Sequence, residues 1–105
     1  MKEITVQDLK KLQDENADFQ LIDVREQVEF DEAHLNGELI PLGEFVTNIE
    51  EITDKISKDK KVVVHCRSGK RSAHAIELLE AEDESYDNLY NLKGGILAYI
   101  DEYGL

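Results

Sequence analysis

The chain has 105 residues, of which 41% are hydrophobic, and it carries a formal net charge of −12. This length suits one domain over residues 1–105, which can bury a core without the help of disulfides or metals. The acidic balance argues against nucleic acid and anionic membranes as partners. The only cysteine excludes an internal disulfide and a cysteine-rich zinc site. We see no secretory segment and no apolar run that could cross a bilayer, so we expect a cytoplasmic protein.

The first half of the chain predicts short elements. Thr5 is typical of a helix start, with Asp8 three residues later in a loose capping box, and Asn16 is a plausible stop. The mostly apolar stretch 19–24 predicts a strand that leads into a loop. A short helix over 28–34 and a short strand over 38–40 follow, closed by the only proline.

The second half has clearer periodicity. Phe45, Ile49, Ile52 and Ile56 form one apolar stripe and predict a single helix. The β-branched stretch 61–65 has no alternation, which favours a strand covered on both faces. A helix through residue 79 follows directly, then a strand over 88–92, the Gly94-Gly95 punctuation and a last helix over 96–103.

Alternation of strands and helices predicts an α/β domain in three layers, with a mainly parallel central sheet and helices on both faces. Ligands bind such sheets beyond the carboxyl ends of the strands. Cys66 follows the valine strand directly, so we expect it at that edge.

The loop over 65–72 combines the cysteine with Gly69 and three basic residues, Arg67, Lys70 and Arg71, and no acid. Free amides at a helix start favour negative charge, and a glycine lets a short loop wrap around one small anion. A free thiol has a pKa of about 8.5, which falls at helix starts and beside cations. The alternative is a buried structural cysteine, but three cations beside an apolar thiol would be hard to accommodate. We therefore expect Cys66 to be largely thiolate at neutral pH.

Four segments resemble one known family. The loop from Cys66 to Ser72 is similar to the active-site loop of single-domain rhodaneses, the thiosulfate sulfurtransferases. Residues 21–30, 34–41 and 92–96 resemble three further motifs of that family in the same order. The resemblance covers nearly the whole chain, although Tyr99 replaces a tryptophan often found after the double glycine.

The resemblance implies a rhodanese-like fold and covalent sulfur transfer without a cofactor. Cys66 would take the sulfane sulfur of thiosulfate or of a persulfide donor, hold it as a persulfide, and pass it to a thiol, to cyanide or to a sulfur-relay protein. Arg71, with Arg67 and Lys70, would hold the anionic donor. The loop amides would cradle the persulfide, which makes these the expected binding residues: Arg67, Ser68, Gly69, Lys70, Arg71 and Ser72.

Other functions remain open at this point. A persulfide carrier that serves a partner protein without turnover needs the same loop, and a low-pKa thiol also suits a redox sensor. An intramolecular arsenate reductase is disfavoured because the chain has no resolving cysteine, and a phosphatase is disfavoured because only four residues separate Cys66 from Arg71. Related phosphatases have five, which makes a wider cradle.

Two residues at the end of the first long strand are candidate supports for the loop. Asp23 and Arg25 could brace it or meet substrate, but we favour a structural ion pair, which could involve Glu29. We expect His65 to be packed or hydrogen-bonded on the opposite side from Cys66, because adjacent strand residues face opposite ways. His34 is expected to be structural and His74 exposed, and no spacing indicates a metal site.

Overall fold

The computed structural model describes residues 1–105. A parallel five-stranded sheet has the order β1-β5-β4-β2-β3. Its strands are β1 (Glu3–Ile4), β2 (Phe19–Asp23), β3 (Glu38–Leu39), β4 (Lys61–His65) and β5 (Leu89–Leu92). The helices are α1 (Val6–Asp14), α2 (Gln27–Glu32), α3 (Leu42–Thr47), α4 (Ile49–Lys55), α5 (Lys70–Glu82) and α6 (Gly95–Tyr103).

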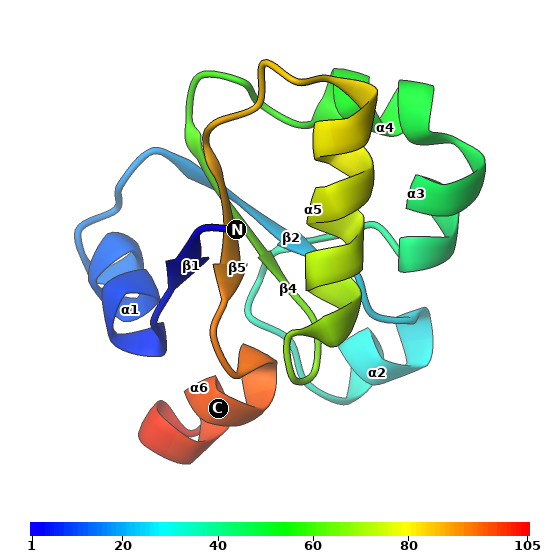
Figure 1. Cartoon of the computed structure of the whole chain (residues 1–105). Coiled ribbons are helices and arrows are strands. Elements are labelled where there is room, and N and C mark those ends of the chain that lie inside the picture. Colours follow the sequence, from blue (N-terminus) through cyan, green and yellow to red (C-terminus); the bar gives the residue numbers. More distant parts are fainter.

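Helices cover both faces of the sheet, as the alternating pattern predicts. In Figure 1, α3, α4 and α5 lie on one side and α1 and α6 on the other. Val62 and Val64 pack into the first side with Phe45, whereas Val63 packs into the second with Leu9. The unbroken valine run therefore belongs to a central strand that is buried on both faces.

The helix start at Thr5 is confirmed. The Thr5 hydroxyl accepts a hydrogen bond from the amide of Asp8 at 3.1 Å, which satisfies one of the free donors at the start of α1. The helix ends before Asn16, whose φ of 51° lies in the left-handed region. The one strand that the sequence did not predict is β1, which has only two residues and ends just before this cap.

The single helix predicted from Phe45 to Ile56 is wrong, because the structure has two helices there. Asn48 has φ −131° and ψ 40°, so it stands outside helical geometry between α3 and α4. Its amide closes α3 by donating to Glu44 at 2.8 Å, and its carbonyl accepts from Ile52 at 3.0 Å. The apolar stripe still packs into the core, since Phe45, Ile52 and Ile56 are all buried.

None of the helices is both long enough and apolar enough to span a lipid bilayer. The elements that matter for the site meet at the carboxyl end of the sheet. There the start of α5 lies near α2 and α6, at the lower end of the molecule in Figure 1.

Candidate active site

The cysteine loop joins the end of β4 to the start of α5. β4 runs between β2 and β5, so Cys66 emerges at the middle of the sheet's carboxyl edge. Gly69 is the N-cap of α5 and has φ 114°, a conformation that glycine adopts without steric cost. This turn folds the loop back over the cysteine side chain.

Polar groups surround the sulfur of Cys66. The Gly69 amide donates to Sγ at 3.1 Å, and the Ser72 hydroxyl lies 3.4 Å from it. Only 1% of the residue is exposed. Burial raises the pKa of the Cys66 thiol, but the Ser72 hydroxyl and the amides of Ser72, Gly69 and Ser68 outweigh it and hold the pKa below its ordinary value. The sulfur is thus buried, as a structural cysteine is, yet bound by donors that favour its anion.

The three cations of the loop have different surroundings. Arg67 and Lys70 are exposed and form no ion pair. Arg71 is half-buried and binds Glu29 through both terminal nitrogens, at 2.6 and 2.8 Å. Its charge also interacts with Cys66. The loop therefore presents two free cations and one that is already paired.

Glu29 was not predicted as a partner of the loop. It lies in the first turn of α2, where its side chain also accepts from the amide of Glu26 at 3.1 Å. The hydrogen bonds from Arg71 hold the pKa of Glu29 at about 2. This pair ties α2 to the start of α5.

Asp23 and Arg25 bind each other rather than the loop. The Asp23 carboxylate accepts from the backbone amide of Arg25 at 3.0 Å and from its Nη2 at 2.9 Å, and Arg25 also donates to the carbonyl of Ala33 at 2.7 Å. Both side chains are buried. This geometry is that of an ion pair between Asp23 and Arg25. Glu29, which the sequence analysis named as a partner in that pair, binds Arg71 instead.

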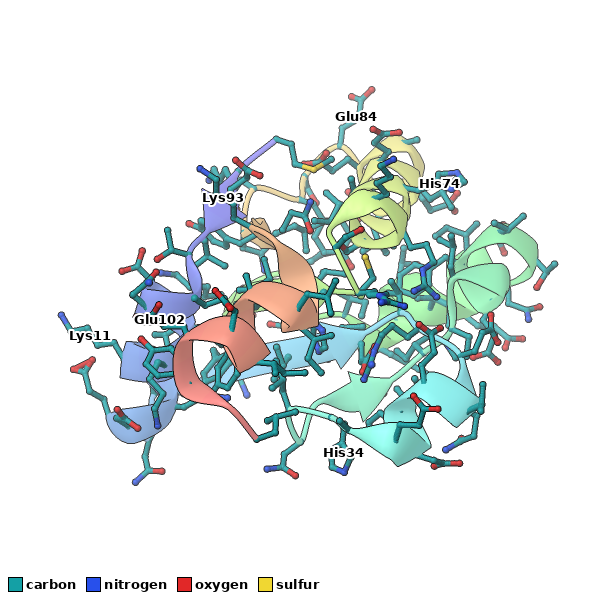
Figure 2. The ribbon with its side chains drawn as sticks, turned by 90° about the horizontal axis from the view of Figure 1, so that it is seen from below. Lys11, His34, His74, Glu84, Lys93 and Glu102 are labelled. Carbon is teal, nitrogen blue, oxygen red and sulfur yellow. The ribbon has the colours of Figure 1, made fainter.

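The three histidines lie away from the sulfur chemistry. His65 is fully buried and neither ring nitrogen has a hydrogen-bond partner, and burial lowers its pKa although the Asp23 carboxylate 3.8 Å away opposes this shift. His34 stacks on Phe30 with ring centroids 4.1 Å apart, and His74 points outward from α5 (Figure 2). No group of three or more His, Cys, Asp or Glu side chains is placed to hold a metal ion.

The double glycine brings α6 against the cysteine loop. The amides of Ile96 and Leu97 donate to the carbonyls of Cys66 and Arg67, at 3.0 and 3.2 Å. A Cβ on Gly95, which has φ 62°, would lie 2.7 Å from the Cys66 carbonyl oxygen and overlap the carbonyl of Arg67. The sequence indicated Gly95 as a break between elements and as part of a family motif, but it did not predict this contact with the cysteine loop.

A second contribution from the end of the chain is the side chain of Asn91 in β5. It is buried, accepts from the Ser72 hydroxyl at 2.6 Å and donates to the carbonyl of Gly69 at 3.0 Å. In the sequence it is one polar residue in an apolar strand, and nothing there indicated these partners.

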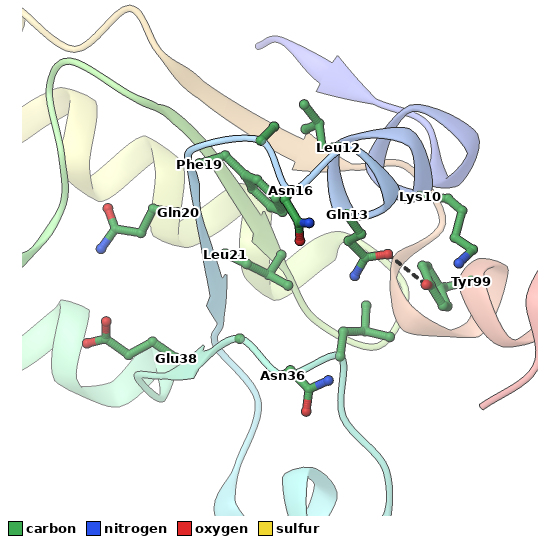
Figure 3. Close-up of a pocket in the computed structure, with 13 residues that line it drawn as sticks. Lys10, Leu12, Gln13, Asn16, Phe19, Gln20, Leu21, Asn36, Glu38 and Tyr99 are labelled. Carbon is green, nitrogen blue, oxygen red and sulfur yellow. Dashed lines mark hydrogen bonds between the residues drawn. The ribbon is translucent and has the colours of Figure 1, made fainter.

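Two cavities differ in their relation to this loop. A cavity of about 670 Å³ lies between α1, β2 and the segment before β3, where Tyr99 donates to Gln13 at 2.7 Å (Figure 3). No loop residue lines it. A smaller cavity of about 220 Å³ lies beside the loop and is lined by Arg67, Glu29, Leu97 and five other residues. The smaller cavity is therefore the one of these two that a residue of the cysteine loop lines.

Comparison with known proteins agrees with this fold. The family model described as a rhodanese-like domain matches residues 5–102. A rhodanese-like domain protein from Staphylococcus aureus superposes with a TM-score of 0.79 at 32% identity, covering 94% of this chain and 91% of that one.

Longer proteins contain a similar segment. A tRNA uridine(34) hydroxylase from Bdellovibrio bacteriovorus is 36% identical over 95 residues, which are 89% of this chain and 27% of that protein. A probable adenylyltransferase/sulfurtransferase MoeZ from Mycobacterium tuberculosis is 35% identical over 100 residues, 94% of this chain and 24% of that protein. The chain thus spans about a quarter of these relatives. From the match over nearly its whole length and from the shared fold, this chain belongs to the rhodanese-like domain family.

Proposed function

We propose that this chain is a sulfurtransferase in which Cys66 carries the transferred sulfur as a persulfide. The observation that carries the proposal is the sulfur's surroundings, where the Gly69 amide at 3.1 Å and the Ser72 hydroxyl at 3.4 Å favour an anion at Sγ. The name of the MoeZ relative supports the same class of reaction.

The reaction consists of two displacements. The Cys66 thiolate attacks the sulfane sulfur of thiosulfate, the S–S bond of thiosulfate breaks, and sulfite leaves with the electron pair. An acceptor thiolate then attacks the outer sulfur of the persulfide, which becomes the acceptor's persulfide, and the Cys66 thiolate is restored. Atoms and electrons balance without an oxidant or a metal.

The burial of Cys66 explains why a persulfide is needed to present sulfur to an acceptor. Because only 1% of the residue is exposed, donor and acceptor both have little direct access to Sγ, and thiosulfate has to approach it with its terminal sulfane sulfur. A persulfide adds a second sulfur about 2 Å farther out. The transferable atom is therefore the one that stands nearest to the acceptor, and the loop amides that remain around it stabilise its charge.

Intact-mass measurement tests the proposal. Reduced protein incubated with thiosulfate should gain the mass of one sulfur atom, and cyanide should remove it. The Cys66→Ala variant should gain nothing. Absence of the added sulfur in the wild-type protein with thiosulfate, and also with a small-molecule persulfide donor, would refute sulfur transfer.

The proposed role of Arg71 has its own test. The Arg71→Ala variant should form the persulfide from thiosulfate about tenfold more slowly, since a charge-assisted anion contact is lost. Its free energy of unfolding should fall by at most about 1 kcal/mol, because the pair with Glu29 is partly exposed. Lys93→Ala, which removes an exposed cation outside the loop, is the control. If the slower persulfide formation were fully accounted for by a larger unfolded fraction of Arg71→Ala, the role of Arg71 would be contradicted.

A persulfide carrier is the second candidate. Its support is that the two relatives above are about four times longer than this chain, so the domain works there beside other parts. A carrier would load from a persulfide donor and pass on its sulfur once, with little turnover on thiosulfate. Steady-state cyanide assays with the two donors separate this behaviour from that of a thiosulfate enzyme.

A further inference from the structure

The side chain of Asn91 is committed entirely to the cysteine loop. Its Nδ2 donates to the carbonyl of Gly69 at 3.0 Å, and its Oδ1 accepts from the Ser72 hydroxyl at 2.6 Å. Its backbone is held in the sheet between Val64 and Glu3, and its amide donates to the carbonyl of Lys2 at 2.9 Å. A side chain on so fixed a backbone can hold the loop in one conformation.

Both loop residues that Asn91 binds also contact the sulfur. The amide of Gly69 lies 3.1 Å from Sγ, and the hydroxyl of Ser72 lies 3.4 Å from it. The Gly69 carbonyl that Asn91 fixes also accepts the amide of Ala73, in the first turn of α5. Asn91 is thus one residue removed from Cys66 along two separate routes.

Proton counting shows what the amide group contributes. The Ser72 hydroxyl has one proton and two neighbouring acceptors, Asn91 Oδ1 and Cys66 Sγ. With a neutral thiol, Cys66 can donate to Ser72 while Ser72 donates to Asn91. With a thiolate, the hydroxyl can turn its proton to the sulfur, because a neutral amide oxygen holds it less strongly than an anion does.

We propose that Asn91 is a positioning residue for the Cys66 thiolate, acting through the Ser72 hydroxyl and through its bond to the carbonyl of Gly69, the residue whose amide contacts Sγ. The proposal deepens the proposed function and rests on it for its catalytic meaning. Its physical content, the ionisation of one thiol, is measurable in the absence of any sulfur donor.

Aspartate has nearly the same shape as asparagine, but it reverses the contributions that the Asn91 side chain makes to the ionisation of Cys66. An aspartate carboxylate would hold the Ser72 proton, leave the Gly69 carbonyl without the Nδ2 donor, and add a negative charge two contacts from the sulfur. All three effects disfavour the thiolate. Asn91→Asp should therefore raise the pKa of Cys66.

The other charged groups around the sulfur do not differ between these variants. Arg71 of α5 interacts with Cys66 and is held by Glu29 of α2, while Arg67 and Lys70 are exposed in the loop. His65 follows Val64 in β4 and so faces the side of Val63, away from Cys66. A change of the Cys66 pKa on substitution of Asn91 therefore reports on Asn91 itself.

Asn88 provides a matched control. It is a buried asparagine just before the same strand, and its Nδ2 donates to the carbonyls of Ser57 and Lys60, away from the cysteine. Asn88→Asp loses the same kind of bond and adds the same charge. Titrating the ultraviolet absorbance of the thiolate in both variants should show a rise of about one pKa unit or more in Asn91→Asp and no change in Asn88→Asp.

A Cys66 pKa in Asn91→Asp that equals or lies below the wild-type value would overturn the proposal. If Asn91→Asp does not fold, Asn91→Ser removes both bonds without adding charge. It frees the Ser72 proton from Oδ1, but it also releases the Gly69 carbonyl, and if Asn91 positions the loop this second effect outweighs the first, so the pKa should rise by about half a unit. An unchanged or lower value overturns the proposal equally. Wild-type protein that forms no persulfide, combined with the expected shift in Asn91→Asp, would refute sulfur transfer and leave the positioning role intact.

Discussion

The absence of a side chain at Gly95 is what allows α6 to reach the cysteine loop. Since an added Cβ would overlap the carbonyl of Arg67 and φ is 62°, Gly95→Ala should lower the free energy of unfolding by about 2 kcal/mol or more. The overlap would push α6 away from the loop. This displacement should also slow persulfide formation, because α6 binds the carbonyls of Cys66 and Arg67. Urea unfolding and intact-mass kinetics measure the two effects.

Gly43 supplies the matched substitution. It lies in α3, and a Cβ there would meet nothing within 4 Å. Gly43→Ala should leave the rate unchanged and raise stability by up to about 1 kcal/mol, through helix propensity. If Gly95→Ala changed the rate and the free energy of unfolding no more than Gly43→Ala does, the close contact at Gly95 would not be needed for stability or for persulfide formation.

At the scale of single residues, the sequence predicts contacts between residues that are close in the chain. Cys66, Gly69 and Ser72 are close in the chain, and the structure brings them together around the sulfur. Glu29 and Asn91 lie 42 residues before Arg71 and 19 after Ser72. Their contacts depend on how whole elements pack, which local spacing does not encode.

At the scale of elements, the start of α1 depends on one hydroxyl. Thr5→Ala removes the acceptor for the amide of Asp8 and should lower the free energy of unfolding by about 1 kcal/mol. Thr47→Ala is the comparison, because the Thr47 hydroxyl only donates back to Gly43 within α3, a bond that adds little stability. Equal urea midpoints for the two variants would show that the cap is dispensable.

The β4 strand was predicted from its own composition, whereas the break between α3 and α4 and the short strand β1 were not predicted. The valine strand was predicted with its correct bounds because its burial on both faces is written in its composition. The break at Asn48 was missed because the apolar stripe continues through it. β1 was missed because two residues show no periodicity, and pairing with β5 is what makes them a strand.

For the whole molecule, acid should weaken the link between α2 and α5. Arg71 holds the pKa of Glu29 at about 2, below its ordinary value of 4.5. A lowered carboxyl pKa contributes stability that is fully present above the ordinary pKa and is lost as pH falls toward the folded-state value. Partial exposure limits this contribution to about 1 kcal/mol.

Urea unfolding of the wild-type protein and Glu29→Gln across acidic pH tests this link. Glutamine keeps one oxygen to accept the capping-box bond of α2, and it removes the charge together with the second oxygen that accepts from Arg71. The wild-type protein should be more stable above about pH 5, and the difference should vanish as pH approaches about 2. Glu32→Gln, on the same helix with no cation partner, should show no such dependence. A Glu29→Gln difference that is constant with pH would contradict the ion pair as its source.

The contacts from β5 and α6 have a consequence for how the protein is made. The side chain of Asn91 and the amides of Ile96 and Leu97 come from the end of the chain, whereas Cys66 is translated well before them. Before these elements are made, no contact from β5 or α6 fixes the Ser72 hydroxyl or the carbonyls of Cys66 and Arg67. The complete set of contacts around Cys66 therefore forms only after β5 and α6 have docked on the sheet.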